Sequence, residues 1–374
     1  MIKRKLTEKI LQLFFKRKII IIYGARQVGK TTLLKQLEEK LNQKVLWLNG
    51  DEPDIRDALS NASSTQIKLV IGNNKVVFID EAQRIKNIGL TLKLIIDNFP
   101  DIQVVATGSS AFELADEIKE PLTGRKFEFF LYPLSIEEII EKIGFLETKR
   151  HLNFILKFGL YPEIFTTPEM AKDLLLSLSD SYLYKDILIN EGIKKPYLLT
   201  KILQALALQI GSEVSFTEIA QLVGTDKNTV EKYINLLEKT FVIFRLNALS
   251  KNLRNEIKKG KKFFFWDIGI RNALISNFNE PNLRPDIGGL WENFVITERI
   301  KYLSNNGIHA NFYFWRSSAT QKEIDFIEEV DGKLRVFEIK WTKKKAKLPL
   351  AFKKNYEIAE FTTISKENFW EFVS

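Results

Sequence analysis

The chain has 374 residues, of which 45% are hydrophobic and 28% charged, and its formal net charge is +9. This length predicts two or three domains with ample core, and no apolar run approaches the roughly 20 residues needed to span a membrane. With no cysteine and two histidines, the sequence excludes disulfides, zinc fingers and thiol catalysis, so any metal is expected to have oxygen ligands. The basic N-terminal stretch lacks a signal-type apolar core and cleavage site, which favours a cytoplasmic chain.

A run of β-branched residues, Ile19–Ile22, predicts a buried strand, and a glycine-rich loop follows it. The loop fits the pattern G-x-x-x-x-G-K-[ST], in which backbone N–H groups face an anion and the next helix favours negative charge. Lys30 is predicted to reach the β- and γ-phosphates of ATP, and the Thr31 hydroxyl to bind Mg²⁺. The alternative, a glycine-rich turn with a chance lysine, is disfavoured by the flanking strand and helix. The candidate nucleotide-binding residues are Gly24, Ala25, Arg26, Gln27, Val28, Gly29, Lys30, Thr31 and Thr32.

A second apolar strand, Val76–Asp80, is followed directly by Glu81. Ligand sites in open α/β sheets lie at the carboxyl ends of strands, so these two carboxylates are expected beside the phosphate loop. Asp80 is predicted to hold Mg²⁺, directly or through water, and Glu81 to polarise the attacking water. The alternative is that both acids merely cap the next helix.

Two further positions are candidates for sensing or stabilising phosphate charge. A strand at Ile102–Ala106 is expected beside the Asp80 strand, and Ser109 follows it with a hydroxyl able to sense the γ-phosphate, although a simple turn would have a similar sequence. Arg125 precedes the predicted strand Phe127–Tyr132. It is a candidate for stabilising transition-state charge, in cis or across a subunit boundary, with a solvated loop arginine as an equal alternative.

The pattern of predicted elements divides the chain into four parts. Alternating strands and helices over residues 1–132 predict a parallel α/β sheet, the core of a P-loop ATPase. Residues 133–194 turn helical and are interpreted as a lid or connector. Residues 195–266 have the order helix, helix, turn, helix and two strands, which is typical of a winged helix-turn-helix. Residues 267–374 are expected to form a separate α/β domain.

The winged-helix interpretation places polar and basic residues where DNA would lie. The recognition helix would present its first turn to the groove, and the basic segment between the two strands would contact phosphates as the wing. The candidate DNA contacts are Lys227, Asn228, Lys258, Lys259, Lys261 and Lys262. The alternative is a rigid spacer or dimerisation unit with a solvated wing, because this fold serves both uses.

A hairpin late in the chain brings acidic residues together. Asp331-Gly332 between two alternating runs is a strong two-residue turn signal, and the register it sets places Asp325 opposite Glu338. Facing carboxylates destabilise a sheet unless a positive group such as a divalent cation lies between them, and Lys340 on the same face could activate a water. The alternative is a surface hairpin with solvated acids. The candidate nuclease-like site is Glu292, Asp325, Glu338 and Lys340, with Glu298 as a substitute for Glu292 and a second Mg²⁺ or Mn²⁺ as its metal.

Several segments in order resemble one prokaryotic family. They are GARQVGKTTLL, VVFIDEAQ, TGSS, LTGRKFEFFLYPLS, YLYKDIL, EVSFTEIAQLVGTDKNTVEKYINLLEKTFVIFRL, DIGIRNAL, LWENFVITERI, FWRSSATQKEIDFI and FEIKW. The chain resembles AAA-superfamily ATP-binding proteins whose C-terminal part is domain of unknown function 4143. The resemblance implies an ATPase core, a winged-helix middle and a restriction-endonuclease-like domain of the PD-(D/E)xK type. Ile324 stands where the nuclease pattern has proline.

These features together lead to one functional expectation and two alternatives. The expected function is a Mg²⁺-dependent ATPase that couples its nucleotide state to engagement of a macromolecule, with DNA as the favoured partner. The first alternative is a metal-dependent DNA endonuclease regulated by ATP. The second is a nucleotide-switched signalling or scaffold protein that contacts no nucleic acid. A homo-oligomer or a protein partner is compatible with all three.

Overall fold

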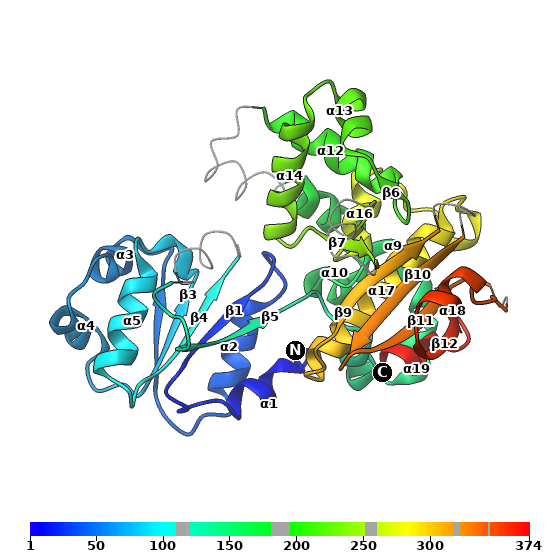
Figure 1. Ribbon diagram of the computed structural model, residues 1–374. Helices are drawn as coiled ribbons and strands as arrows, with labels where there is room; N and C mark the ends of the chain where they lie inside the picture. Colours follow the sequence, from blue (N-terminus) through cyan, green and yellow to red (C-terminus); the bar gives the residue numbers. More distant parts are fainter. Residues whose placement is uncertain (110–117, 119, 181–194, 251–259, 318–321, 343–344) are drawn as a thin grey trace. The chain divides into compact units, whose positions relative to one another are not determined.

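The computed structural model describes residues 1–374 apart from 110–117, 119, 181–194, 251–259, 318–321 and 343–344 (Figure 1). The described chain forms two compact units. Unit 1 comprises Met1–Leu134 with Lys239–Phe241, and unit 2 comprises Ser135–Glu238 with Val242–Ser374. The predicted division between residues 266 and 267 falls inside unit 2. Among the described helices, none combines the length and apolar character that a membrane span requires.

Unit 1 is an α/β fold around one parallel sheet. The strands lie in the order β2-β3-β4-β1-β5, and every pairing is parallel. The prediction of a parallel sheet is therefore confirmed, as is the position of β4 beside β3. The elements are α1 (Leu6–Leu11), β1 (Ile19–Tyr23), α2 (Lys30–Glu38), β2 (Val45–Asn49), α3 (Pro53–Leu59), α4 (Ser64–Ile71), β3 (Val76–Asp80), η1 (Ala82–Arg84), α5 (Ile88–Asn98), β4 (Gln103–Gly108) and β5 (Lys126–Phe130).

The strands of unit 1 consist mainly of apolar residues because helices cover both faces of the sheet. All five residues of β1 are buried, and so are all five of β3. Alternate residues of a strand point to opposite faces, and Ile19, Ile21 and Tyr23 share a hydrophobic core with Ile67 of α4 and Leu92 of α5. The carboxyl ends of β1, β3 and β4 meet at one edge of this sheet, and the loops that follow these strands carry the predicted nucleotide site.

Unit 2 combines helices with a sheet of seven strands. Its helices are α7 (Ile136–Ile143), α8 (Phe145–Arg150), α9 (Leu152–Phe158), α10 (Pro162–Thr166), η2 (Pro168–Met170), α12 (Pro196–Leu208), α13 (Phe216–Val223), α14 (Lys227–Lys239), α16 (Ile268–Leu274), η3 (Pro281–Leu283), α17 (Ile287–Asn305), α18 (Leu350–Asn355) and α19 (Phe369–Val373). Its strands are β6 (Glu213–Val214), β7 (Ile243–Ala248), β8 (Lys261–Phe265), β9 (Asn311–Arg316), β10 (Glu323–Val330), β11 (Lys333–Ile339) and β12 (Ile358–Ile364). Residues 181–194, at the end of the segment predicted to be helical, lie outside the described residues.

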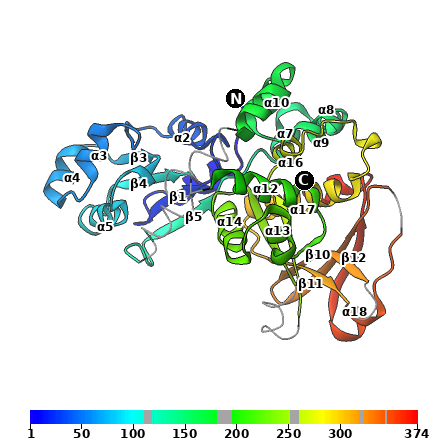
Figure 2. The same ribbon diagram turned by 90° about the horizontal axis from the view of Figure 1, so that it is seen from above.

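The seven strands lie in the order β12-β11-β10-β9-β7-β8-β6. Parallel pairing of β7 with β9, through Asn247↔Tyr313 and Ala248↔Phe314, joins the strands of the predicted wing to those of the C-terminal part. Both views show α18 beside β11 and β12, and its Phe352 packs in a core with Ile324 and Val336 (Figures 1 and 2). The two segments that were predicted to be separate domains thus share one sheet.

The β10–β11 hairpin has the register predicted from its turn. Val330 pairs with Lys333, and the pairing runs to Phe326 with Phe337, the residues next to Asp325 and Glu338. Asp331 and Gly332 both have positive φ, of 50° and 74°, which is the backbone of the tight hairpin turn that Asp-Gly favours.

Candidate functional site

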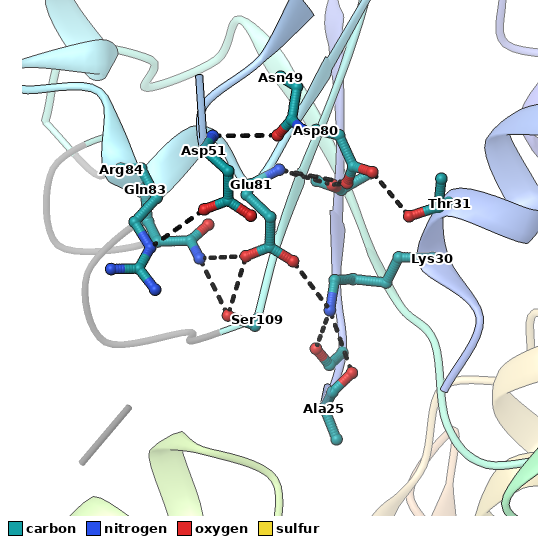
Figure 3. A network of polar contacts seen from close by, with 12 residues as sticks. Ala25, Lys30, Thr31, Asn49, Asp51, Asp80, Glu81, Gln83, Arg84 and Ser109 are labelled. Carbon is teal, nitrogen blue, oxygen red and sulfur yellow. Dashed lines mark hydrogen bonds and ion pairs between the residues drawn. The ribbon is translucent and has the colours of Figure 1, made fainter. Parts of the chain in front are cut away.

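The loop between β1 and α2 holds Lys30 at the first turn of the helix. Gly29, the residue before it, has φ 95° and ψ 33°, a left-handed conformation that favours glycine. The Lys30 side chain is 5% exposed, and its Nζ donates to the carbonyl oxygens of Gly24 at 3.0 Å and Ala25 at 3.1 Å. Nζ also lies 3.8 Å from Glu81 Oε1 at the end of β3 (Figure 3). The two predicted motifs therefore meet.

Asp80 joins the phosphate loop to β4 through two hydroxyl groups. Thr31 Oγ1 donates to Asp80 Oδ2 at 2.6 Å, and Thr107 Oγ1 donates to Asp80 Oδ1. Hydroxyl and carboxylate oxygens are the ligands that Mg²⁺ prefers, so the chemistry of Thr31 and Asp80 fits the ion that the P-loop fold implies. Thr107, near the end of β4, belongs to this group as well.

Glu81 has a strained backbone. Its φ of 49° is left-handed, which is uncommon for a residue other than glycine and costs about 1 kcal/mol or more. Its N–H is held by Asp80 Oδ1 at 3.2 Å and Thr107 Oγ1 at 3.3 Å. A Cβ on Gly50, which follows β2, would lie 2.4 Å from the Glu81 carbonyl oxygen, so only glycine fits there. Strain of this kind is typical of functional positions.

The Glu81 side chain is fixed by two residues of neighbouring elements. Gln83 Nε2 donates to Glu81 Oε2 at 2.6 Å and to Ser109 Oγ at 2.9 Å, and Ser109 Oγ donates to the same Glu81 oxygen at 3.2 Å (Figure 3). Gln83 Oε1 is buried without a hydrogen-bond partner among the described residues. Gln83 was not among the predicted site residues, although it stands two residues after Glu81, in the η1 turn that follows the acid.

Arg125 lies at the amino ends of the strands, whereas this site lies at their carboxyl ends. It directly precedes β5, whose Lys126 pairs with Ile19 at the start of β1, whereas the phosphate loop follows the end of β1. Arg125 Nε contacts Asp97 Oδ1 at 2.8 Å. The predicted role of Arg125 in cis is therefore wrong, because the length of the sheet separates its guanidinium from the phosphates. A role across a subunit boundary stays a prediction.

The other loop candidates differ in burial. Ala25 and Val28 are buried, Arg26 and Thr32 are partly exposed, and Gln27 is exposed with φ 57°.

In unit 2, three carboxylates converge from α17 and β10. The ligand atoms of Glu292, Glu323 and Asp325 all lie within 4.8 Å of one another, and we call these residues the carboxylate cluster. Asp325 Oδ2 accepts the Ile339 N–H at 2.7 Å. Glu292 and Asp325 are predicted members of the site, whereas Glu323 was not among the predicted site residues.

Glu298 lies elsewhere in unit 2. It accepts the Ile136 N–H at 2.8 Å and pairs with Lys301 at 2.7 Å.

The carboxylate cluster contains a cation supplied by the chain. The Lys262 side chain, on β8, is 1% exposed, and its Nζ lies 3.0 Å from Glu292 Oε1 and also pairs with Glu323. Burial alone would lower the pKa of Lys262, but the two carboxylates raise it above its usual range. Burial raises the pKa of Glu292 to about 8 despite the ion pair. The prediction that Lys262 contacts DNA is therefore wrong, because its ammonium is buried in ion pairs.

The predicted Glu338–Lys340 pair lies beside the cluster. Lys340 Nζ is 2.7 Å from Glu338 Oε1 and 3.4 Å from Asp325 Oδ2. Burial and the Asp325 charge raise the pKa of Glu338. The hairpin thus brings Asp325, Glu338 and Lys340 together and α17 adds Glu292, but Lys262 already neutralises part of the charge of the site.

The remaining DNA candidates lie on or near the α12–α14 helices. Lys227 and Asn228 are exposed in the first turn of α14, whose start is fixed by Asp226 Oδ1 accepting the Thr229 N–H at 2.9 Å. Lys261 is partly buried, with Nζ 5.5 Å from the centre of the Phe216 ring. Lys258 and Lys259 lie outside the described residues.

The arrangement in unit 1 defines a class: an ATPase fold with a phosphate loop. Family comparison agrees, because residues 16–140 match the model described as "AAA domain". Residues 149–281 match a "Domain of unknown function (DUF8612)" and residues 287–367 a "Domain of unknown function (DUF4143)". The chain therefore carries a P-loop AAA domain followed by a domain of unknown function 4143.

Proteins of other organisms are similar to most of the chain. An uncharacterized protein of Haemophilus influenzae is 28% identical over 277 residues, which is 69% of each chain. An uncharacterized protein of Methanocaldococcus jannaschii is 27% identical over 333 residues, covering 83% of this chain and 72% of the relative. The solved Walker-type ATPase of Pyrococcus abyssi matches with a TM-score of 0.52 and 15% identity, over 74% of this chain and 96% of that one. This last similarity shows the fold alone.

Proposed function

We propose that the chain is a Mg²⁺-dependent ATPase that couples its nucleotide state to engagement of a macromolecule, and that this macromolecule is DNA. The observation that supports hydrolysis is the meeting of Lys30, Asp80 and Glu81 at one edge of the unit 1 sheet. A binding loop alone needs no second carboxylate, whereas Glu81 is strained, oriented by two donors and within 3.8 Å of the phosphate-binding lysine. These are the features of a poised general base.

Each residue has a separate task in this proposal. Lys30 exchanges its contacts with the loop carbonyls for the β- and γ-phosphates, and Thr31 and Asp80 hold Mg²⁺, which when bound neutralises phosphate charge. Glu81 accepts the proton of the attacking water. Gln83 and Ser109 fix the Glu81 carboxylate so that one oxygen faces the site.

Two substitutions test the hydrolytic site. Lys30→Ala is expected to abolish ATP binding, because the phosphates lose their main cation. Glu81→Gln is expected to retain ATP affinity and lower kcat by about a hundredfold or more, the usual contribution of a general base. Calorimetry measures the ATP affinity of each variant, and phosphate release from the same samples measures its turnover. Normal turnover by Glu81→Gln would show that another group positions the water.

The DNA partner is supported by unit 2 and by charge. The order α12, β6, α13, α14, β7 and β8 is the order of a winged helix-turn-helix, and Lys227 and Asn228 are exposed at the start of α14. The net charge of +9 favours an acidic partner. Asp226 beside these residues works against phosphate binding, so groove contacts by Asn228 fit better than a purely electrostatic surface.

The coupling is tested by ATP turnover with and without duplex, junction and single-stranded DNA, at several salt concentrations. Stimulation by one DNA form, lost steeply with salt, is the expected result. Turnover indifferent to every DNA would favour the signalling or scaffold alternative and direct the search to protein partners.

The endonuclease remains a second candidate because Asp325, Glu338 and Lys340 lie together on β10 and at the end of β11. Mg²⁺- or Mn²⁺-dependent nicking in the same reactions, abolished by Asp325→Ala, would support it. Lys262 argues against it, because an ammonium that pairs with Glu292 and Glu323 lowers the charge available to a metal ion. No nicking is therefore the expected result.

A further inference from the structure

Arg4 contacts the phosphate loop from outside the sequence motif. The residue is 4% exposed. Its Nη1 donates to the Val28 carbonyl oxygen at 2.6 Å, and its Nη2 donates to the Tyr132 carbonyl oxygen at 2.7 Å. Val28 is the loop residue before Gly29, and Tyr132 follows β5. One guanidinium therefore joins the phosphate loop to the end of the strand that pairs with β1.

The contact with Val28 sets the direction of the next N–H group. In a planar trans peptide the carbonyl and the following N–H point to opposite sides. A Val28 carbonyl held by Arg4 therefore turns the Gly29 N–H away from Arg4. In the G-x-x-x-x-G-K-[ST] pattern the loop N–H groups face the phosphates. Gly29 has φ 95°, a left-handed backbone that favours glycine.

We propose that Arg4 is a positioning residue of the phosphate cradle, which orients the Val28–Gly29 peptide so that its N–H can donate to a nucleotide phosphate. The inference rests on the proposed ATPase function and adds to it a residue outside the motif. Arg4 does not touch the nucleotide in this proposal; it acts through the loop backbone.

The backbone of Arg4 is itself anchored on α2. Arg4 N–H donates to Gln36 Oε1 at 2.9 Å, and Gln36 Nε2 donates to the Ile2 carbonyl at 2.7 Å. Thr7 Oγ1 donates to the same Gln36 oxygen at 3.0 Å. Because α2 begins with Lys30, the helix that carries the phosphate-binding lysine also fixes the residue that orients the loop before it.

The geometry requires arginine at this position. A planar guanidinium presents several N–H donors in fixed directions and can serve two carbonyls at once, whereas the compact ammonium of lysine is a point charge. A lysine in place of Arg4 would reach the Val28 carbonyl or the Tyr132 carbonyl but hold neither in a fixed plane. We therefore expect a graded series, with Arg4→Lys intermediate and Arg4→Ala weakest.

The test compares ATP hydrolysis by the full-length wild type, Arg4→Lys, Arg4→Ala and Thr7→Val. Thr7→Val is the matched control, because it removes a hydrogen bond from the same segment to Gln36 and leaves the guanidinium in place. We expect KM for ATP to rise about ten- to a hundredfold in Arg4→Ala, the effect of one hydrogen bond to a charged group. We expect kcat to change by less than about twofold, because a phosphate that is held equally in ground and transition states affects KM alone. Thr7→Val is expected to match the wild type in both constants.

Added guanidinium ion gives a readout that a purely structural role would not move. At millimolar concentration it is expected to lower KM of Arg4→Ala towards the wild-type value and to leave Thr7→Val unchanged. The proposal would be overturned if Arg4→Lys had the wild-type KM for ATP and Arg4→Ala either had the same KM or failed to fold. A wild type that neither binds nor hydrolyses ATP would instead overturn the proposed function, so the two failures are distinguishable.

Discussion

Gln83 connects two parts of the nucleotide site that lie on different strands, since its amide donates to Glu81 after β3 and to Ser109 after β4. Gln83→Ala removes the donor that holds the Glu81 carboxylate. We expect kcat to fall about tenfold or more with ATP affinity unchanged, because a misplaced base affects the chemical step and not the phosphate contacts. Single-turnover hydrolysis measures this. Ser109→Ala, which keeps the Gln83 contact, should show a smaller loss; an equal loss would assign Ser109 the larger role.

Asp286 is a residue of unit 2 whose charge matters for stability. Burial would raise its pKa, but hydrogen bonds from Arg284 and Arg271 lower the pKa of Asp286 to about 2. The side chains of both arginines are at most 1% exposed.

A carboxyl with a lowered folded-state pKa stabilises the protein above its ordinary pKa of 3.8 and loses this contribution as the pH falls towards 2. The difference in unfolding free energy between wild type and Asp286→Asn should therefore shrink by about 2 kcal/mol between pH 5 and pH 2. Urea unfolding at a series of pH values measures it. A difference independent of pH would mean that the pKa of Asp286 is the same in the folded and unfolded states.

At the scale of single residues, the sequence predicts those whose role depends on near neighbours in the chain. Lys30 and Thr31 follow from the loop motif, and Asp80 and Glu81 from the end of an apolar strand. Arg4 and Lys262 could not be predicted in their observed positions, because each is one of several basic residues in a row. Which of them becomes buried depends on elements that fold against it from far along the chain.

Lys262 illustrates how one side chain joins elements. It extends from β8 to Glu292 on α17 and Glu323 on β10, with its Nζ 5.4 Å from the centre of the Phe314 ring on β9. Removing one partner of a buried ion pair leaves uncompensated charge and costs about 3–5 kcal/mol. Lys262→Met is expected to lower the unfolding free energy of unit 2 by about this amount.

Lys261→Met is the matched control, because Lys261 is the neighbour of Lys262 on the same strand and is partly exposed. A loss below about 1 kcal/mol is expected for it. Denaturant unfolding of the full chain compares the two variants. Similar losses in both would show that the Lys262 ion pairs contribute no more to stability than a surface charge.

At the scale of elements, local turn chemistry was predictable and long-range pairing was not. The register of the β10–β11 hairpin follows from Asp331-Gly332, because a two-residue turn fixes which residues face each other. The parallel pairing of β7 with β9 has no local signal. It joins strands with more than 60 residues between their first residues, Ile243 and Asn311, and only burial of a shared core decides it.

At the scale of the whole molecule, the position of Arg125 makes self-association testable. In an isolated chain, Arg125→Ala should leave ATP hydrolysis within about twofold of the wild type, because the residue lies at the far edge of the sheet from the phosphates. If the arginine acts on a neighbouring copy, the wild-type rate per chain should rise with protein concentration and that of the variant should not. Turnover measured over a hundredfold range of concentration separates the two cases.

The continuous sheet of unit 2 has a mechanical consequence. Seven hydrogen-bonded strands lie side by side from β6, which stands between α12 and α13 in the chain, to β12, which packs against α18. Because β7 pairs with β9, the segments matched by DUF8612 and DUF4143 are joined through the sheet as well as along the chain. A displacement of α14 is therefore expected to move α18 as well. Unit 2 should move as a single body. Cutting the chain between residues 266 and 267 would leave β6, β7 and β8 on one fragment and β9 to β12 on the other.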